Sequence, residues 1–276
     1  EGNGWLPIGE YNEDGSSDVF CGNFDGCNHT ISNMKIVTDK FCSGLFGATS
    51  GLSERSFKAV AIKNIVLKDF SIDSSYEVPD LEENPGCGGV IGKARNNTQV
   101  SNCTANGSIN AKVGGVGGIV GAMEGINYSC LFKSCSFEGT ISFRSDEIHS
   151  GFNTLGGCVG YAYYVNISDC NSKVTLEDST EYPEDFYDYY GKALGGLVGR
   201  HEYGYISNSH VVAGNITGYT NVGGLVGFFD SVDVENCDVE FNRICATNGS
   251  IGGFAGYGYG KLNDILRELA LKQIKL

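Results

Sequence analysis

The sequence has few basic residues, few prolines and no long hydrophobic run, and each shortage excludes a class of protein. Lys and Arg number 19 against 33 Asp and Glu, for a formal net charge of −14. Because nucleic-acid binding needs clustered basic side chains, we expect no nucleic-acid partner. No stretch approaches the ~18 apolar residues of a spanning helix, so we expect no membrane span in this segment. Only 4 Pro accompany 41 Gly, and no Gly-X-Y period indicates collagen.

The sequence also lacks the cysteine and histidine spacings of a zinc site. Its 11 cysteines include no CxxC pair, and its 4 histidines are scattered along the chain. An odd cysteine count leaves at least one thiol unpaired or bonded to another chain. Cys21 and Cys27, which flank a Gly-rich turn, are the candidate local disulfide.

What the sequence does contain is a glycine phrase that occurs seven times. The copies are GLFG (44–47), GGVIG (88–92), GGIVG (117–121), GGCVG (156–160), GGLVG (195–199), GGLVG (223–227) and GGFAG (252–256). Successive copies are 28–29 residues apart in the plainest units and up to 45 apart where the unit carries an insertion. This spacing indicates a structural repeat.

A second phrase with alternating apolar residues follows each of the first six copies. Its copies are IKNIVLKDFSI (62–72), VSNCTANGSI (100–109), FKSCSFEGTI (132–141), ISDCNSKVTL (167–176), ISNSHVVAGNI (206–216) and VENCDVEFNRI (234–244). The alternation predicts strands, and Gly and Asn supply the corners between them. Short strands of this kind bury their apolar side by stacking coil on coil at ~4.8 Å. We therefore predict an all-β protein, a right-handed parallel β-solenoid (β-helix) of about seven to eight coils over residues 1–260.

The second phrase also places one residue of each unit in an inward column. We interpret this column as small buried thiols and apolar side chains, with a Cys103–Cys135 disulfide as the alternative. Its members are Ile65, Cys103, Cys135, Cys170, Ser209 and Cys237.

The closing segment 261–276 departs from the repeat. KLNDILRELALKQIKL has no Gly and spaces its apolar residues as an amphipathic helix does, with Asn263 as the N-cap. We expect an α-helix that caps the open end of the solenoid, where strand edges would otherwise be exposed. A partner-binding helix that supports end-to-end association, or a foreign tail, are the alternatives.

The three longest insertions fall at one point of the repeat, at 73–86, 142–154 and 177–193. The same point of successive coils lies along one edge of a stack, so we expect these loops to form a ridge. They carry most of the formal negative charge of the chain.

The third insertion combines carboxylates with aromatic rings. Such a mixture suits a sugar, a protein surface or Ca²⁺, which prefers oxygen ligands, and a solvated loop packed on the solenoid is the alternative. Ca²⁺ is the candidate cofactor, with Asp178, Glu181 and Asp185 as its ligands. The candidate ligand-binding residues are Asp178, Glu181, Tyr182, Glu184, Asp185, Tyr187, Asp188, Tyr189 and Tyr190.

Asn-x-Ser/Thr sequons predict N-glycosylation, unless the repeated phrases produce them for structural reasons. They begin at Asn28, Asn96, Asn102, Asn106, Asn127, Asn166, Asn215 and Asn248.

The glycine phrases, in register with the second phrase and preceded by GWLPIGEYN (4–12), resemble the GLUG-repeat family over roughly residues 5–256. The resemblance implies a secreted or cell-surface protein, since the repeats of this family occur in large surface proteins, notably bacterial adhesins. It brings no catalytic residues.

We accordingly expect a non-catalytic, adhesin-like binding module, located outside the cell or at its surface. Its partner would be a protein or glycan of a host or neighbouring cell. A purely structural stalk is one alternative. A polysaccharide-degrading β-helix enzyme is another, and the scarcity of basic residues near the acidic loops opposes it.

Overall fold

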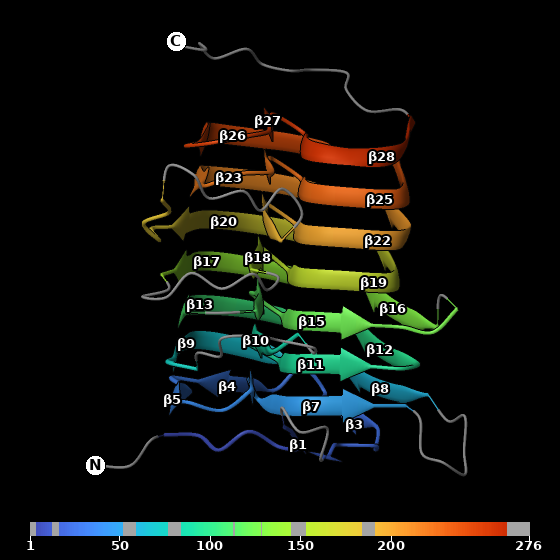
Figure 1. The fold of residues 1–276 in the computed structure, drawn as a ribbon. Helices are drawn as coiled ribbons and strands as arrows, with labels where there is room; N and C mark the ends of the chain where they lie inside the picture. Colours follow the sequence, from blue (N-terminus) through green and yellow to red (C-terminus); the bar gives the residue numbers. More distant parts are fainter. Residues whose placement is uncertain are drawn as a thin grey trace.

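The structure is a computed structural model that describes residues 4–12, 17–51, 59–76, 84–112, 114–127, 129–144, 153–183 and 191–263. Within these ranges every regular element is a β-strand, and the strands stack in layers along one axis (Figure 1). This arrangement confirms the all-β, stacked parallel fold that the repeat predicts. No helix with the length and hydropathy of a membrane span occurs in the described ranges.

Three parallel sheets form the sides of the stack, and a full repeat contributes to each of them. The seven-stranded sheet contains β6 (Cys42–Ser43), β10 (Gly86–Gly88), β14 (Gly114–Gly117), β18 (Asn153–Gly156), β21 (Lys192–Gly195), β24 (Val222–Gly223) and β27 (Ile251–Gly252). The eleven-stranded sheet contains β3 (Phe24–Asp25), β7 (Phe46–Ser50), β8 (Val60–Lys63), β11 (Ile91–Arg95), β12 (Thr98–Ser101), β15 (Val120–Glu124), β16 (Cys130–Lys133), β19 (Val159–Ser168), β22 (Val198–Ser207), β25 (Val226–Glu235) and β28 (Ala255–Asn263). The eight-stranded sheet contains β4 (Thr30–Ser32), β5 (Lys35–Thr38), β9 (Val66–Ser74), β13 (Thr104–Ala111), β17 (Ser136–Phe143), β20 (Asn171–Asp178), β23 (His210–Gly218) and β26 (Asp238–Ala246). A short antiparallel pair, β1 (Glu10–Tyr11) and β2 (Ser17–Asp18), lies at the N-terminal end.

The glycine phrase forms the corner between the seven- and eleven-stranded sheets. In the fifth copy, β21 ends at Gly195, β22 begins at Val198, and the bend lies between them. A Cβ on Gly196 would come within 2.2 Å of the carbonyl oxygen of Gly224 in the next coil. The adjoining Leu197 is fully buried. The phrase recurs because every corner needs one residue without a side chain and one apolar residue beside it.

The corner between the eleven- and eight-stranded sheets uses an asparagine followed by a small buried residue. Asn102 and Asn208 have φ of 53° and 49°, in the left-handed region that Asn tolerates. The next residue is buried in each unit, which confirms the inward column of Ile65, Cys103, Cys135, Cys170, Ser209 and Cys237. The thiols of this column are free, and each bonds the carbonyl two residues back, as Cys170 Sγ does with Ser168 O at 3.0 Å.

One continuous hydrophobic cluster fills the space between the three sheets, from Met34 near the first coil to Cys237 near the last. Along a strand, successive side chains alternate between the outer face of the sheet and the core, as the exposed–buried pattern of β20 shows. Burial of this cluster provides the main stabilisation of the stack, because no single coil has a core of its own.

The segment predicted as a helix begins instead as a strand. β28 runs to Asn263, and its Lys261 and Asn263 pair in parallel with Asp233 and Glu235 of β25. Residues 261–263 are therefore not helical, which corrects the predicted start of the helix at 261, and Asn263 as the N-cap of a later helix stays a prediction. The edge of β25 offers hydrogen-bond partners along the whole strand, and these outweigh the local helix propensity. Residues 264–276 lie outside the described residues, so a capping helix there stays a prediction.

Candidate binding surface

The three long insertions all connect the same two sheets. They follow β9, β17 and β20 of the eight-stranded sheet and precede β10, β18 and β21 of the seven-stranded sheet. Their described flanks therefore lie along one edge of the stack, as a ridge requires. The corresponding connection between β23 and β24 consists of residues 219–221 alone. Coil closure thus needs only a short turn, and the long loops are additions to it.

The base of the third insertion is fixed by the side chain of Asp178. Its Oδ1 accepts a hydrogen bond from Thr180 N at 3.0 Å, and its Oδ2 accepts one from Tyr182 Oη at 2.9 Å. The Tyr182 ring packs on Tyr219, with 4.3 Å between ring centroids. Burial raises the pKa of the Asp178 carboxyl above its ordinary value. Asp178 and Tyr182 therefore anchor this loop, and of the predicted contact residues Glu181 is the exposed one here.

The rest of the predicted contact set lies outside the described residues. It comprises Glu184, Asp185, Tyr187, Asp188, Tyr189 and Tyr190. One of the three predicted calcium ligands, Asp185, also lies outside the described residues, while Asp178 and Glu181 lie within them. Over the ranges that the structure describes, no three His, Cys, Asp or Glu side chains come together as a metal site. Calcium binding stays a prediction.

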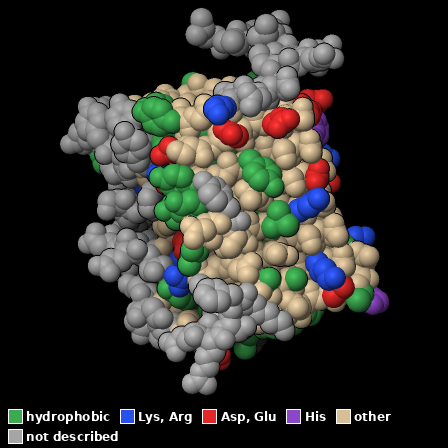
Figure 2. Space-filling view, turned by 90° about the vertical axis from the view of Figure 1, so that its right-hand side faces the viewer, with side chains coloured by type: hydrophobic (Ala, Val, Ile, Leu, Met, Phe, Trp, Pro, Cys, Tyr) green, Lys and Arg blue, Asp and Glu red, His purple; other side chains and the backbone are tan. Residues whose placement is uncertain are grey.

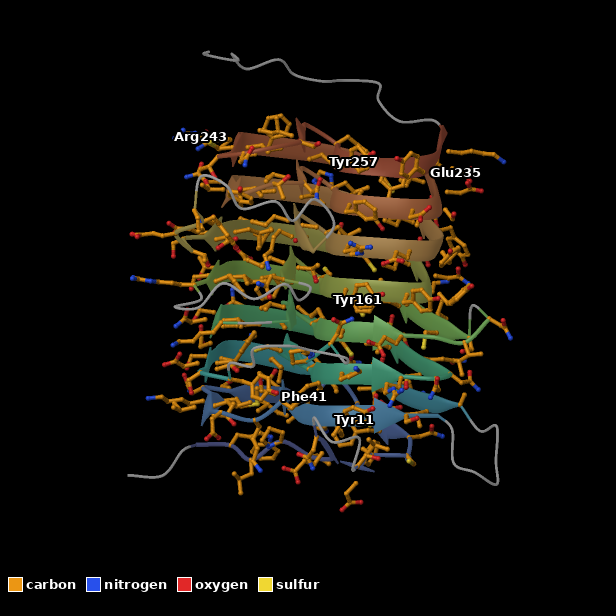
Figure 3. All side chains as sticks on the ribbon, viewed as in Figure 1. Tyr11, Phe41, Tyr161, Glu235, Arg243 and Tyr257 are labelled. Atoms are coloured by element: carbon orange, nitrogen blue, oxygen red, sulfur yellow. The ribbon has the colours of Figure 1, made fainter. Side chains whose placement is uncertain are left out.

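A second surface, which we call the outer stripe, runs along the outer face of the eleven-stranded sheet. It consists of the residues one and three places after the last glycine of each phrase, which adjacent strands hold in register. Tyr161 and Tyr257 mark its course along the stack (Figure 3). The members are Ala48, Lys93, Ala122, Tyr161, Arg200, Phe228 and Tyr257 in one row, and Ser50, Arg95, Glu124, Tyr163, Glu202, Asp230 and Tyr259 in the other.

The N-terminal part of the outer stripe is an ion cluster around one buried lysine. Lys93 is fully buried, with its Nζ 3.3 Å from Glu124 Oε1 and 2.9 Å from the carbonyl oxygen of Asn84. The Lys93 and Arg95 cations lie 5.2 and 4.7 Å from the centre of the Tyr11 ring. The cluster ties Tyr11 of the N-terminal segment to β11 and β15. Loss of the partners of Lys93 would be costly, because an unpaired charge would then remain buried.

The C-terminal part of the outer stripe combines aromatic rings with one ion pair. Arg200 Nε donates to Glu202 Oε1 at 2.7 Å, and the same oxygen accepts a bond from Tyr161 Oη at 3.4 Å. The Arg200 guanidinium lies 4.3 Å from the ring centre of Phe228, which in turn stacks with Tyr257. Burial raises the pKa of Tyr161.

Two tyrosines beside the outer stripe have a backbone conformation that is rare for aromatic residues. Tyr164 and Tyr203 have φ of 52° and 55°, while the next coil has Ser231 at this place. Their rings stack at 4.8 Å with an interplanar angle of 14°, and Tyr163 meets the Tyr164 ring edge-on at 4.6 Å. A left-handed non-Gly residue costs about 1 kcal/mol. The ring stacking offsets part of that cost and keeps three tyrosines together on two neighbouring coils.

Sequence reasoning missed the outer stripe, although its signal is present. The segments VGYAYYV (159–165), VGRHEYGY (198–205) and AGYGYG (255–260) place Tyr, Arg or Glu at the same offsets from the phrase. The glycines are the most regular feature of these segments, and the residues that follow them resemble ordinary alternating strand residues. Only their register across the coils shows that they form one surface.

The corner opposite the ridge is a mixed-charge surface. Figure 2 views the stack from this side and shows basic and acidic side chains interspersed. Lys63 pairs with Asp25 at 3.3 Å and Lys133 with Asp169 at 3.6 Å, each between neighbouring coils. Exposed pairs of this kind contribute little to stability. Negative charge is therefore less concentrated at this corner than in the insertions of the ridge.

The predicted sequons divide by their exposure in the fold. Asn28, Asn102, Asn127, Asn215 and Asn248 are exposed, whereas Asn96, Asn106 and Asn166 are half-buried. Oδ1 of Asn166 is enclosed and accepts no hydrogen bond, and Thr98 of the Asn96 sequon is fully buried, where it donates to Arg95 O at 2.6 Å. Occupancy at every sequon stays a prediction, and the enclosed Asn166 Oδ1 and the buried Thr98 oppose a glycan at these two.

We expect a folded, secreted form made in a glycosylating host to lack glycans at Asn96 and Asn166, because the Asn166 amide oxygen and the Thr98 side chain are packed inside the fold. Glycopeptide mass spectrometry of the folded monomer provides the measurement, with exposed Asn28 and Asn127 as the internal comparison. High occupancy at Asn166 in protein that still unfolds cooperatively would contradict the packing described above.

Cys21 and Cys27 are exposed and occur in the structure as free thiols. The Cys27 backbone has φ of 50° in a turn closed by the bond from Cys27 N to Asp25 Oδ1 at 2.9 Å. The Cys21–Cys27 disulfide is thus not formed in this structure, and its formation on oxidation stays a prediction.

Two comparisons with known proteins bear on this architecture. A family model described as the GLUG motif matches residues 84–110, which contain β10 to most of β13 and the second glycine phrase. The chain is also similar to halomucin of Haloquadratum walsbyi, with 31% identity over 167 residues. The match covers 57% of this chain and 2% of halomucin, so the chain corresponds to a small part of that protein.

Proposed function

Since this chain belongs to the GLUG-repeat family, we propose that it is a non-catalytic binding module at a cell surface or outside the cell, with the ridge as its contact surface. The partner is a protein or glycan of a host or neighbouring cell. The observation that carries this proposal is the placement of all three long insertions between the same two sheets, while the core beneath them repeats.

The anchored base of the third insertion supports a contact role. The connection at 219–221 closes a coil with three residues, so the extra length of the third insertion is not needed for closure. Here Asp178, Thr180 and Tyr182 hold the first residues of the loop against Tyr219. Fixing a loop before it binds lowers the entropy cost of binding.

We further propose that the solenoid is right-handed and has about seven to eight coils, and that residues 264–276 contain the capping helix. The open end after β28 supports a cap, because the last described strands have no neighbour on one side. A purely structural stalk and a polysaccharide-degrading enzyme are the two competing functions, and each predicts a different outcome below.

Replacement of residues 179–190 by a three-residue turn, with the sequence of 219–221, is expected to abolish binding and leave the fold intact. Binding is measured on a glycan array and on cells, with Ca²⁺ and with EDTA. Loss of binding in EDTA would show that binding depends on Ca²⁺, and its retention would oppose a calcium site at Asp178, Glu181 and Asp185. Circular dichroism and thermal unfolding verify the fold.

A matched control is Glu240→Gln, an exposed acidic site on β26 that is expected to leave binding unchanged. Unchanged binding by the loop-replaced protein would favour the stalk. Release of reducing sugar ends, abolished by neutralising a single carboxylate, would favour the enzyme.

A further inference from the structure

A pocket of about 450 Å³ lies at the N-terminal end of the stack, apart from the predicted contact residues of the ridge. β1, β2 and the segment between β5 and β6 form its walls. Tyr11 and Phe41, which lie beside it, are labelled at this end in Figure 3. Its volume falls within the range of pockets that hold small ligands, and a single long side chain is smaller than that range requires. The lining includes Trp5, Leu6, Val37, Glu10, Asp18 and Asp39.

One side of the pocket is apolar, and its indole ring is held by a hydrogen bond. Trp5 is the single tryptophan of the chain, and its Nε1 donates to the carbonyl oxygen of Leu45 at 3.1 Å. That bond fixes the indole while 40% of the residue stays exposed. Leu6 and Val37, also in the lining, are 79% and 42% exposed. Apolar side chains this exposed around one concave site indicate a contact surface.

The other side of the pocket carries an excess of negative charge. Glu10 and Asp18 stand directly opposite each other in the β1–β2 pair, and like charges at such positions repel. Lys40 Nζ, 2.8 Å from Glu10 Oε1, offsets one of them. Asp18 and Asp39 add two further carboxylates against that single cation in the lining.

From this combination we propose that the pocket receives a lysine or arginine side chain of a partner protein. The apolar stem of such a side chain fits against Val37 and the indole of Trp5, and its cationic head meets Asp18 and Asp39. A cation over an indole face is itself favourable, and a basic group would relieve the repulsion between Glu10 and Asp18. The net charge of −14 attracts basic partners to the molecule as a whole.

The pocket uses none of the predicted ridge contacts, so this inference stands independently of the proposed function. A neutral sugar is the competing occupant, because indole rings and carboxylates also suit sugar hydroxyls. The two occupants differ in charge, and therefore in how binding responds to salt and to removal of a carboxylate.

Trp5 fluorescence provides a direct readout, since no other tryptophan contributes to the signal. The whole chain is titrated with the peptide acetyl-Gly-Arg-Gly-amide, with its Gln counterpart, and with a neutral oligosaccharide. We expect saturable quenching by the Arg peptide alone, weakened by added salt. The Asp18→Asn/Asp39→Asn double variant is expected to bind about tenfold more weakly, as the loss of two partly exposed ion pairs implies.

Two variants separate a local effect from a change in overall charge or folding. Asp233→Asn removes an exposed carboxylate on β25 and is expected to bind like the wild type. Lys40→Met removes the cation that competes for Glu10 and is expected to tighten binding of the Arg peptide, an increase that mere damage to the fold would not produce. Equal response to the Gln peptide or the sugar, or no response to any of them, would overturn the proposal. Binding lost in Lys40→Met would do so as well.

Discussion

Gly196→Val is expected to destabilise the protein by about 3 kcal/mol or more, as severe overpacking does. A Cβ at this corner would lie 2.2 Å from the carbonyl oxygen of Gly224 and 2.6 Å from Val211 Cγ1. The first of these contacts is backbone of the next coil, which cannot move without displacing its own ladder. The measurement is denaturant unfolding followed by circular dichroism.

The matched control for this corner is Gly214→Ala in β23 of the same coil. A Cβ there meets the Thr175 hydroxyl at 2.5 Å, and the next nearest atom is 3.7 Å away. Because a rotatable side chain gives way more readily than backbone, the change should cost far less. Equal stability of Gly196→Val and Gly214→Ala would refute the account of the glycine phrase as a sterically closed corner.

Acid is expected to destabilise the protein through His201 by about 3 kcal/mol between pH 6.5 and pH 4. This side chain is fully buried in β22; Nε2 lies 2.9 Å from Val165 O, and Nδ1 has no hydrogen-bond partner. Burial lowers the pKa of His201 from 6.5 to about 4. Since the folded pKa lies below the unfolded value, the stability is present above pH 6.5 and is lost as the pH falls toward 4.

His201→Met tests this expectation, because the same inward row holds a fully buried methionine, Met123, two coils earlier. The difference in unfolding free energy between variant and wild type is measured from pH 7 to pH 4. We expect the variant to lose less stability than the wild type over that range. Exposed His29→Gln serves as the comparison for removing a histidine outside the core. Parallel pH profiles for wild type and His201→Met would show that burial of this ring carries no acid sensitivity.

Much of the fold was predictable because the repeat displays its own constraints. The spacing of the phrases predicts stacked coils, and the alternation in 167–176 predicts the exposed and buried sides of β20 correctly. The column from Ile65 to Cys237 follows from the same alternation. By contrast, residues 261–263 have helix-forming character and still form a strand, because the neighbouring strand β25 decides their hydrogen bonding.

The candidate sites were predictable only in part. Sequence places Asp178 and Tyr182 in an acidic, aromatic insertion but cannot show that each is already used by a neighbour. The N-terminal pocket draws Trp5, Asp18 and Asp39 from separate segments, and no local pattern joins them. The outer stripe has a local pattern, but its meaning depends on strand register.

By itself, the sequence determined that this chain is a stack of similar β-coils, with its glycines and asparagines at the corners and its acidic insertions on one edge. Each of these features repeats along the chain, and a repeated local pattern is enough to specify a repeated local structure. Only the tertiary structure decided which side chains of different coils meet. The burial of Lys93 beside Glu124, the enclosure of His201 and the stacking of Tyr164 on Tyr203 all depend on register between coils, because register decides which side chains of neighbouring strands lie side by side and how deeply they are buried.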